Sequence, residues 1–154
     1  MVKLSLSRPC YGLGQGGGGV DNLSAGGICV SVDDSGRLAE VGRTWVLGGT
    51  HEYKCFYEHP MSHIAFKGLR HPLFSKMSEC VINCARRIPY ANILGWDVIA
   101  TNDGDVKLFE VNANNLLMDA PQYDFGSLFG DDTRNVIDWC LEHRSFMRYQ
   151  HVRM

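Results

Sequence analysis

The chain has 154 residues, with 15 Lys and Arg against 17 Asp and Glu and a formal net charge of −2 at pH 7. This length is typical of a single domain, so we expect residues 1–154 to form one. The near balance of charge excludes general binding to a phosphate backbone, and no nucleic-acid partner is expected. Hydrophobic residues make up 45% and charged residues 21%, which excludes a wholly disordered chain.

No apolar run approaches the roughly 18 residues of a membrane span. Residues 1–8 alternate apolar and polar side chains and lack the apolar core of a signal peptide. We therefore expect a cytoplasmic protein with no membrane span. In that compartment the six cysteines are interpreted as reduced thiols, several of them facing the core.

The segment from 55 to 71 contains residue types that bind zinc, namely Cys55, His59, His63 and His71. Their spacing matches no closed zinc finger, and His59 and His71 each precede a proline, which favours extended backbone. We favour an ordinary surface segment over a zinc site, and the sequence leaves the role of these residues open.

The first part of the chain predicts a loop followed by a hairpin. Glycines are concentrated between Gly12 and Gly27, with four in a row at 16–19, which excludes a helix or strand there. Residues 28–33 alternate, which predicts a half-buried strand with Ile28, Val30 and Val32 on one face. Residues 34–36 predict a turn and 37–45 a returning strand. Residues 48–71 have no clear period and predict a long surface loop.

The second part predicts a helix, a hairpin and a final helix. Apolar residues at helical spacing predict a helix over 74–88, ended by Pro89. A hairpin covers about 95–112, and a helix begins near the acidic residues 131–133. Strand pairs alternating with single helices indicate an α+β fold: an antiparallel sheet built from hairpins, with two packed helices. The predicted buried stripe of the final helix is Val136, Trp139, Cys140, His143 and Met147.

The second hairpin carries the most informative pattern. Asp103-Gly104 is a strong turn signal between two apolar strands. A two-residue loop there, or a four-residue loop over 102–105, pairs residues whose numbers sum to 207. That register places Asp97 directly opposite Glu110, and Asn112 projects from the same face because it follows Glu110 by two.

Two carboxylates facing each other on a sheet repel unless something neutralises them. Regular alternation places no Lys or Arg on this face and puts Trp96 and Phe109 on the opposite face, in a core. Carboxylate and amide oxygens are hard ligands that suit Mg²⁺ or Mn²⁺. The alternative is a pair of solvated carboxylates without a metal. The other residues that alternation assigns to the Asp97 face are Ile99, Thr101, Val106 and Leu108.

These residues resemble a known family. Residues 95–98 and 108–112 resemble the metal-binding hairpin of the ATP-grasp ligases, in which an acid, a Glu about thirteen later and an Asn two beyond bind the magnesium ions of ATP. Residues 22–27 resemble the Asn-x-x-x-Gly-Gly segment of these enzymes, and Arg8 matches the Arg that often precedes it. The ordered set is most similar to the sugar-transfer-associated ATP-grasp group. Further matching strings are 36–38, 59–60, 66–68 and 88–90.

The resemblance implies the C-terminal, metal-binding lobe of an ATP-grasp fold. Its activity would be ATP-dependent ligation of a carboxylate to an amine or related nucleophile through an acyl phosphate, in polysaccharide or sugar-transfer biosynthesis. The implied cofactors are ATP and Mg²⁺ or Mn²⁺. Asp97, Glu110 and Asn112 would bind the metal, with Asn112 also at the nucleotide. Arg8 and Asn22 would be catalytic, and Gly26 and Gly27 would let backbone N–H groups approach the phosphates.

The resemblance also sets expectations about partners. The N-terminal, nucleotide-clamping lobe is not expected within these 154 residues. We therefore expect either a partner chain that carries that lobe or a homo-oligomer, with ATP and a carboxylate as ligands. The alternative functions are a non-catalytic nucleotide- or metal-binding remnant and an interaction module. A fragment, a split subunit and a pseudoenzyme all stay open.

Overall fold

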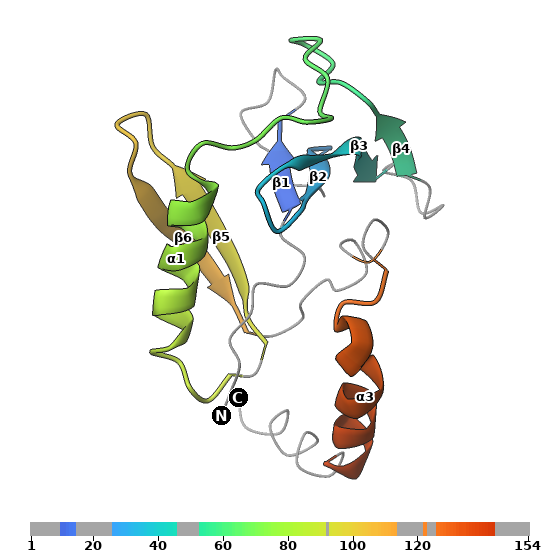
Figure 1. The fold of residues 1–154 in the computed structure, drawn as a ribbon, viewed down its shortest axis with the longest axis vertical. Helices are drawn as coiled ribbons and strands as arrows, with labels where there is room; N and C mark the ends of the chain where they lie inside the picture. The colour runs from blue at the N-terminus through green and yellow to red at the C-terminus, as the bar shows by residue number, and fades with distance from the viewer. Residues whose placement is uncertain are drawn as a thin grey trace.

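A computed structural model describes residues 10–14, 26–45, 53–91, 93–113, 122 and 126–143. The fold is α+β with antiparallel sheets and helices α1 and α3, as the sequence predicts (Figure 1). Within the described residues, no helix has the length and apolar character needed to cross a membrane. The elements are β1 (Cys10–Leu13), β2 (Ile28–Val32), β3 (Leu38–Trp45), β4 (Tyr53–Phe56), α1 (Phe74–Ala85), β5 (Gly95–Ala100), β6 (Val106–Asn112), the short 3-10 helix η2 (Gly130–Asp132) and α3 (Thr133–Glu142).

The core lies on one face of the four-stranded sheet, whose strand order is β1-β2-β3-β4. Ile28 and Val30 are 0% exposed and Val32 is 3% exposed, as predicted, but Ser31 is buried as well at 2%, so this strand is more buried than the predicted half-buried strand. Phe66, at 1% exposed, packs against the same face from the segment that follows β4. Half-buried side chains surround this cluster: Tyr11, Leu13, Leu38, Ala39 and Phe56.

The turn between β2 and β3 forms as predicted and is fixed by one carboxylate. Asp33 accepts the backbone N–H groups of Arg37 and Ser35, each at 2.9 Å. These bonds, the Arg37 one foremost, hold the pKa of Asp33 below its usual range. Gly36 has φ +83° and lies against the ring of Phe74, so the turn also contacts the start of α1.

The prediction of a featureless loop over 48–71 is wrong. Residues 53–56 form β4, which pairs with β3, and Phe66 is a core residue. Strand β1 was likewise not predicted. Both strands are only four residues long, so neither repeats its alternation often enough to stand out beside the neighbouring glycines and prolines.

Helix α1 confirms the predicted helix but ends three residues early. The N–H groups of Arg87 and Ile88 bond to carbonyls only three residues back, so tighter turns lead into Pro89. Val81 is buried, and the helix packs against both strands of the second hairpin.

Helix α3 begins at Thr133, close to the predicted start, but its predicted buried stripe is wrong. None of its described residues is buried, and Trp139 is 44% exposed. Val136 and Cys140 are half-buried, while Trp139 stacks on the exposed ring of His143 at 4.3 Å. Among the described elements its main contacts are with η2, so the apolar stripe has no sheet to cover. Met147 lies outside the described residues.

We expect Gly42→Ala to destabilise the fold by about 1–3 kcal/mol, as is typical of overpacked cores. A Cβ at this position would lie 2.6 Å from Ile28 Cγ2 and 2.9 Å from Phe66 Cε2. Urea unfolding followed by circular dichroism measures the change. Ala65→Val, which adds carbon at an exposed position, is the matched control and should shift the midpoint little. An unchanged midpoint for Gly42→Ala would contradict this account of the core.

Candidate functional site

The second hairpin has the predicted register where the acidic residues lie. Asp97 pairs directly with Glu110, and Gly95 pairs with Asn112. Directly opposed residues have Cβ atoms about 4.5–5.5 Å apart. Both acidic residues are exposed and Asn112 is half-buried. The hairpin therefore brings two carboxylates and one amide to the same face, as predicted.

The loop and the strand pairing that produce this register differ from the predicted ones. The loop has three residues, 102–104, because the Thr101 N–H donates to the Asp105 carbonyl at 2.9 Å. Gly104 closes the loop with φ +79°, as is usual for a three-residue hairpin loop. A β-bulge next to Asp97 then shifts the pairing by one, so that Val98 pairs with Leu108.

The bulge corrects three expectations about the faces of this hairpin. Phe109 is the extra residue and is 74% exposed, so it does not anchor a core. Leu108 and Val106 pair with Val98 and Ala100 and are half-buried, so they do not share the Asp97 face.

Lys107 takes their place on that face, because it pairs with Ile99, two residues beyond Asp97. The face therefore contains a cation that the sequence analysis did not place there, and this cation offsets part of the repulsion between the two carboxylates.

Helix α1 fixes the far end of the hairpin. Lys76 Nζ donates to the Gly104 carbonyl and to the Asp105 carboxylate, both at 3.0 Å. Within the turn, the Asp103 carboxylate accepts the hydroxyl of Thr101 and the N–H of Asp105. The hydroxyl of Thr101 holds the pKa of Asp103 below its usual range. The backbone N–H of Val106, followed by Lys76, does the same for the pKa of Asp105.

The face of the four-stranded sheet opposite the core comes close to Asp97. Cys10 and Cys29 lie on this face, and Arg43 pairs with Cys29 from the next strand. A hydrogen bond from Cys29 lowers the pKa of Cys10, while the Asp97 carboxylate acts in the opposite direction. The same bond raises the pKa of Cys29, and Arg43 acts against that rise. Asp97 is therefore near enough to β1 for its charge to act on Cys10.

The connection between Cys10 and the hairpin was not predicted from the sequence. The alternation of β2 places Cys29 away from Ile28 and Val30, and this was the available signal for the second face. Which element covers that face depends on tertiary packing, which a periodic pattern does not contain.

The other predicted site residues are placed only in part. Gly26 lies just before β2 with φ +90°, and Gly27 beside it is buried. No heavy atom lies within 4 Å of a Cβ built on Gly26, so its backbone conformation, and not space, favours glycine there. Arg8 and Asn22 lie outside the described residues, and their predicted positions stay predictions.

The three histidines among the candidate zinc ligands each have a hydrogen-bond partner. His59 Nε2 lies 2.8 Å from the Gly14 carbonyl, His63 Nδ1 lies 2.8 Å from Glu58, and His71 Nδ1 accepts the Leu73 N–H. Across the described residues, no group of three or more His, Cys, Asp or Glu side chains could hold a metal ion. The hairpin site is of a different kind, because its third ligand would be the amide of Asn112.

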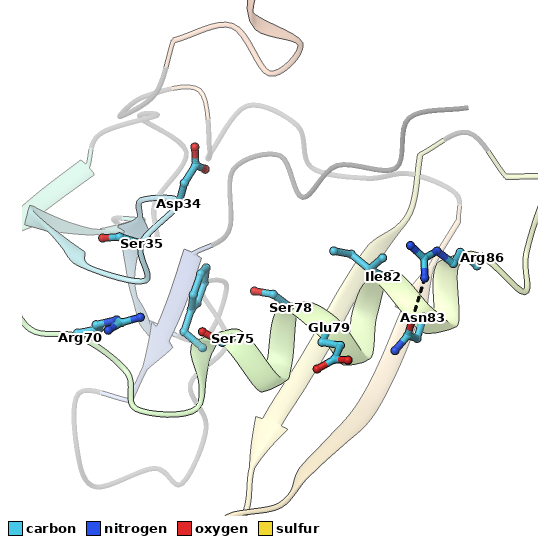
Figure 2. Close-up of a pocket in the computed structure, with 10 residues that line it drawn as sticks. Asp34, Ser35, Arg70, Ser75, Ser78, Glu79, Ile82, Asn83 and Arg86 are labelled. Atoms are coloured by element: carbon cyan, nitrogen blue, oxygen red, sulfur yellow. Dashed lines mark hydrogen bonds between the residues drawn. The ribbon is translucent and has the colours of Figure 1, made fainter. Parts of the chain in front are cut away.

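An open groove of about 500 Å³ lies between the β2–β3 turn and α1. Figure 2 shows α1 presenting Ser78 and Ile82 to it, with Arg70 at one end and Arg86 at the other. Asp97, Glu110 and Asn112 do not line this groove, so it is separate from the hairpin site. The remaining lining residues are Asp34, Ser35, Phe74, Ser75, Glu79 and Asn83.

Comparison with protein families decides the assignment. Residues 11–130 match the model of the sugar-transfer associated ATP-grasp family, which is more than half of the chain. The chain belongs to this family. The match includes the Asp97–Glu110 hairpin and the Asn22–Gly27 segment, whereas Arg8 precedes it and α3 follows it. No curated protein and no solved structure matches this ATP-grasp chain significantly.

We expect the turn of the hairpin to lose stability in acid. The folded-state pKa values of Asp103 and Asp105 are lowered, so their contribution is present above the ordinary carboxyl pKa of 3.8 and is lost as the pH falls through the lower folded values. Hydrogen exchange at the Gly104 and Asp105 amides between pH 5 and pH 2.5 tests this. The rates are expressed as protection factors, which correct for the pH dependence of the intrinsic exchange rate.

The variant Asp103→Asn should flatten that dependence, because an amide does not titrate in this range. Asp138→Asn, which changes an acid on α3 paired with Arg134, is the matched control. A protection profile that is the same in Asp103→Asn as in the parent would refute the role of this carboxylate.

Proposed function

We propose that this ATP-grasp chain supplies the metal- and phosphate-binding side of an ATP-dependent ligase that activates a carboxylate as an acyl phosphate. Membership of the family supports an ATP-dependent, ligase-like function in sugar transfer. The observation that carries the proposal is the direct pairing of Asp97 with Glu110, with Asn112 on the same face.

The donor set fits a magnesium or manganese ion. Asp97, Glu110 and Asn112 offer only oxygen ligands, and Mg²⁺ usually takes one or two carboxylates and completes its shell with water and phosphate oxygens. When bound, the metal would neutralise phosphate charge, which is most of what phosphoryl transfer needs. Lys107, on the same face, adds a positive charge beside the carboxylates without replacing a ligand.

The rest of the proposed site comes from the glycine-rich segment. We assign Arg8 to stabilising the transferred phosphoryl group or the acyl-phosphate oxyanion, and Asn22 to donating a hydrogen bond near the same oxygens. Gly26 and Gly27 would present backbone N–H groups to the phosphates, and the positive φ of Gly26 supports this role. In the second hairpin, the contact of Lys76 of α1 with the turn would help to keep the carboxylates of the metal site fixed.

The described residues form one side of a nucleotide clamp. Nucleotide sites bury most of their ligand between several walls. We therefore propose that a second lobe, from a partner chain or a second copy, completes the ATP site, and that this chain alone binds ATP weakly. A carboxylate would be the acceptor of the phosphoryl group.

A second candidate, a non-catalytic interaction module, rests on the apolar side chains exposed by the hairpin. Ile99 is 46%, Phe109 74% and Val111 45% exposed. Exposed apolar side chains gathered on one element often belong to a protein interface. A metal-binding ligase lobe and an interaction module differ in whether Mg²⁺ binds at Asp97 and Glu110.

Isothermal titration of the 154-residue protein with Mg²⁺, with and without ATP, tests the ligase proposal. We expect Glu110→Gln to weaken Mg²⁺ binding by about tenfold or more. Loss of a group that only orients a metal ligand lowers metal affinity by about tenfold or more, and loss of the ligand itself should lower it at least as much. Asp97→Asn should act similarly. Glu142→Gln, an exposed acid on α3, is the matched control and should bind as the parent does.

Two outcomes would contradict the proposal. One is Mg²⁺ binding that is equal in the parent and in Glu110→Gln. The other is the absence of binding in the parent even when ATP is present, which would favour the interaction module. Far-ultraviolet circular dichroism of each variant distinguishes a lost ligand from a lost fold.

A further inference from the structure

Two cysteines form a thiol pair on the sheet face next to the hairpin. Cys10 pairs across the strands with Ser31, and Cys29 pairs with Gly12, so the two cysteines occupy one diagonal of the β1–β2 ladder. The two thiols are near enough to shift each other's pKa, lowering that of Cys10 and raising that of Cys29. Cys10 is exposed and Cys29 is half-buried, so small oxidants can reach the pair.

The space around the pair favours closer approach. Gly12 has no side chain, so no side chain of β1 lies directly across from Cys29, and the Cys29 sulfur can lean toward Cys10. Diagonal neighbours have Cα atoms about 7–8 Å apart, whereas a disulfide needs about 4.4–6.8 Å. One strand therefore has to shift by about 1 Å for a bond to form.

Strand β1 is able to make that shift. It has four residues, lies at the edge of the sheet among the described strands, and is hydrogen-bonded there to β2 alone (Figure 1). Cys10 is its first residue, so only the end of the strand has to move.

A second pair of neighbouring cysteines lies on a helix, where a disulfide is harder to form. Cys80 and Cys84 are also neighbours, but they lie four residues apart on α1. Helical geometry holds such Cβ atoms about 5–6 Å apart, whereas a disulfide needs about 3.5–4.5 Å. The backbone bonds of α1 oppose any shortening, so this pair is a built-in comparison.

We propose that Cys10 and Cys29 form a reversible disulfide, which makes this face a thiol-oxidation site beside Asp97. With a peroxide as the oxidant, each thiol gives up one proton and one electron, one S–S bond forms, and hydrogen peroxide is reduced to two waters. A dithiol reductant reverses the step by thiol–disulfide exchange, which restores both cysteine thiols and leaves the reductant as its own disulfide.

Peptide mass spectrometry of the full 154-residue protein tests the proposal. After brief treatment with hydrogen peroxide, free thiols are alkylated and the chain is cut before Asp21 and Asp33. Cys10 then lies in fragment 1–20 and Cys29 in fragment 21–32, so only a disulfide keeps these fragments together. We expect the linked species to form, to disappear with dithiothreitol, and to exceed any link within Cys80–Cys84.

Variants separate the pair from general oxidation. Cys10→Ser and Cys29→Ser should each abolish the linked species. Cys55→Ser, which removes an exposed cysteine of β4 in the same sheet, is the matched control and should leave it unchanged. Full alkylation of both fragments after peroxide would overturn the proposal, as would Cys10 linked as often to another cysteine as to Cys29.

The position of the pair implies an effect on the proposed metal site, and this part rests on the proposed function. A disulfide draws the Cys10 end of β1 toward β2 and so changes the surroundings of Asp97. We expect the Mg²⁺ dissociation constants of reduced and oxidised protein to differ by about threefold or more, because the electrostatic interaction of Asp97 with a bound ion depends on its immediate surroundings. Equal constants would refute this coupling. Failure of the reduced protein to bind Mg²⁺ would count against the proposed function alone, since the fragment masses decide the disulfide independently.

Discussion

The pairing of Asp97 with Glu110 is the constraint on which the functional interpretation of this molecule depends. Side chains on a strand alternate between faces, so a register error of one residue would send the two carboxylates to opposite sides. Three features keep the register: the three-residue loop closed by Gly104, the bulge at Phe109, and the contact of Lys76 with the turn. The second hairpin is thus held in place by α1 on one side while its acidic face stays open.

Charged groups other than the two carboxylates lie on this hairpin and on the neighbouring sheet. Lys107 lies beyond the acidic pair on the same hairpin, and Arg43 lies on the neighbouring sheet beside Cys29. On that sheet, the ionisation of Cys10 is opposed by the Asp97 carboxylate. Lys107 therefore adds a positive charge beside the two carboxylates, which fits a site that handles a metal ion together with an anionic ligand.

The sequence predicted the elements that repeat their pattern. Strand β2, strand β3, helix α1 and the second hairpin each extend over enough residues for a period to be visible, and all were confirmed. Strands β1 and β4 are too short for this, and the burial of Phe66 depends on a contact with β2 that no local pattern encodes. The exposure of Phe109 was missed because a bulge leaves no mark in the alternation of residue types.

The acidic pair was nevertheless predicted correctly, and the reason is arithmetic. The prediction assumed two or four unpaired residues, all in the loop. The structure has four, three in the loop at 102–104 and one at Phe109. With Asp97 and Glu110 thirteen residues apart, an even number of unpaired residues between them places both side chains on the same face. Both the predicted and the observed numbers are even, so the predicted loop was wrong but the predicted face was right. The effect of Asp97 on Cys10 had no such local determinant.

The unpaired position of Phe109 has a consequence for how this family varies. Removing an unpaired residue leaves every cross-strand partner in place, so deletions at Phe109 or within 102–104 keep Asp97 facing Glu110 provided the loop still closes. Deleting Val98, a paired residue whose strand has no unpaired neighbour to replace it, would place Asp97 next to Ile99 and turn its carboxylate to the opposite face. The interval of 13 between the two acids is therefore not an obligatory signature. Relatives with a shorter interval can carry the same oxygen cluster, and a search that insists on fixed spacing would pass over them.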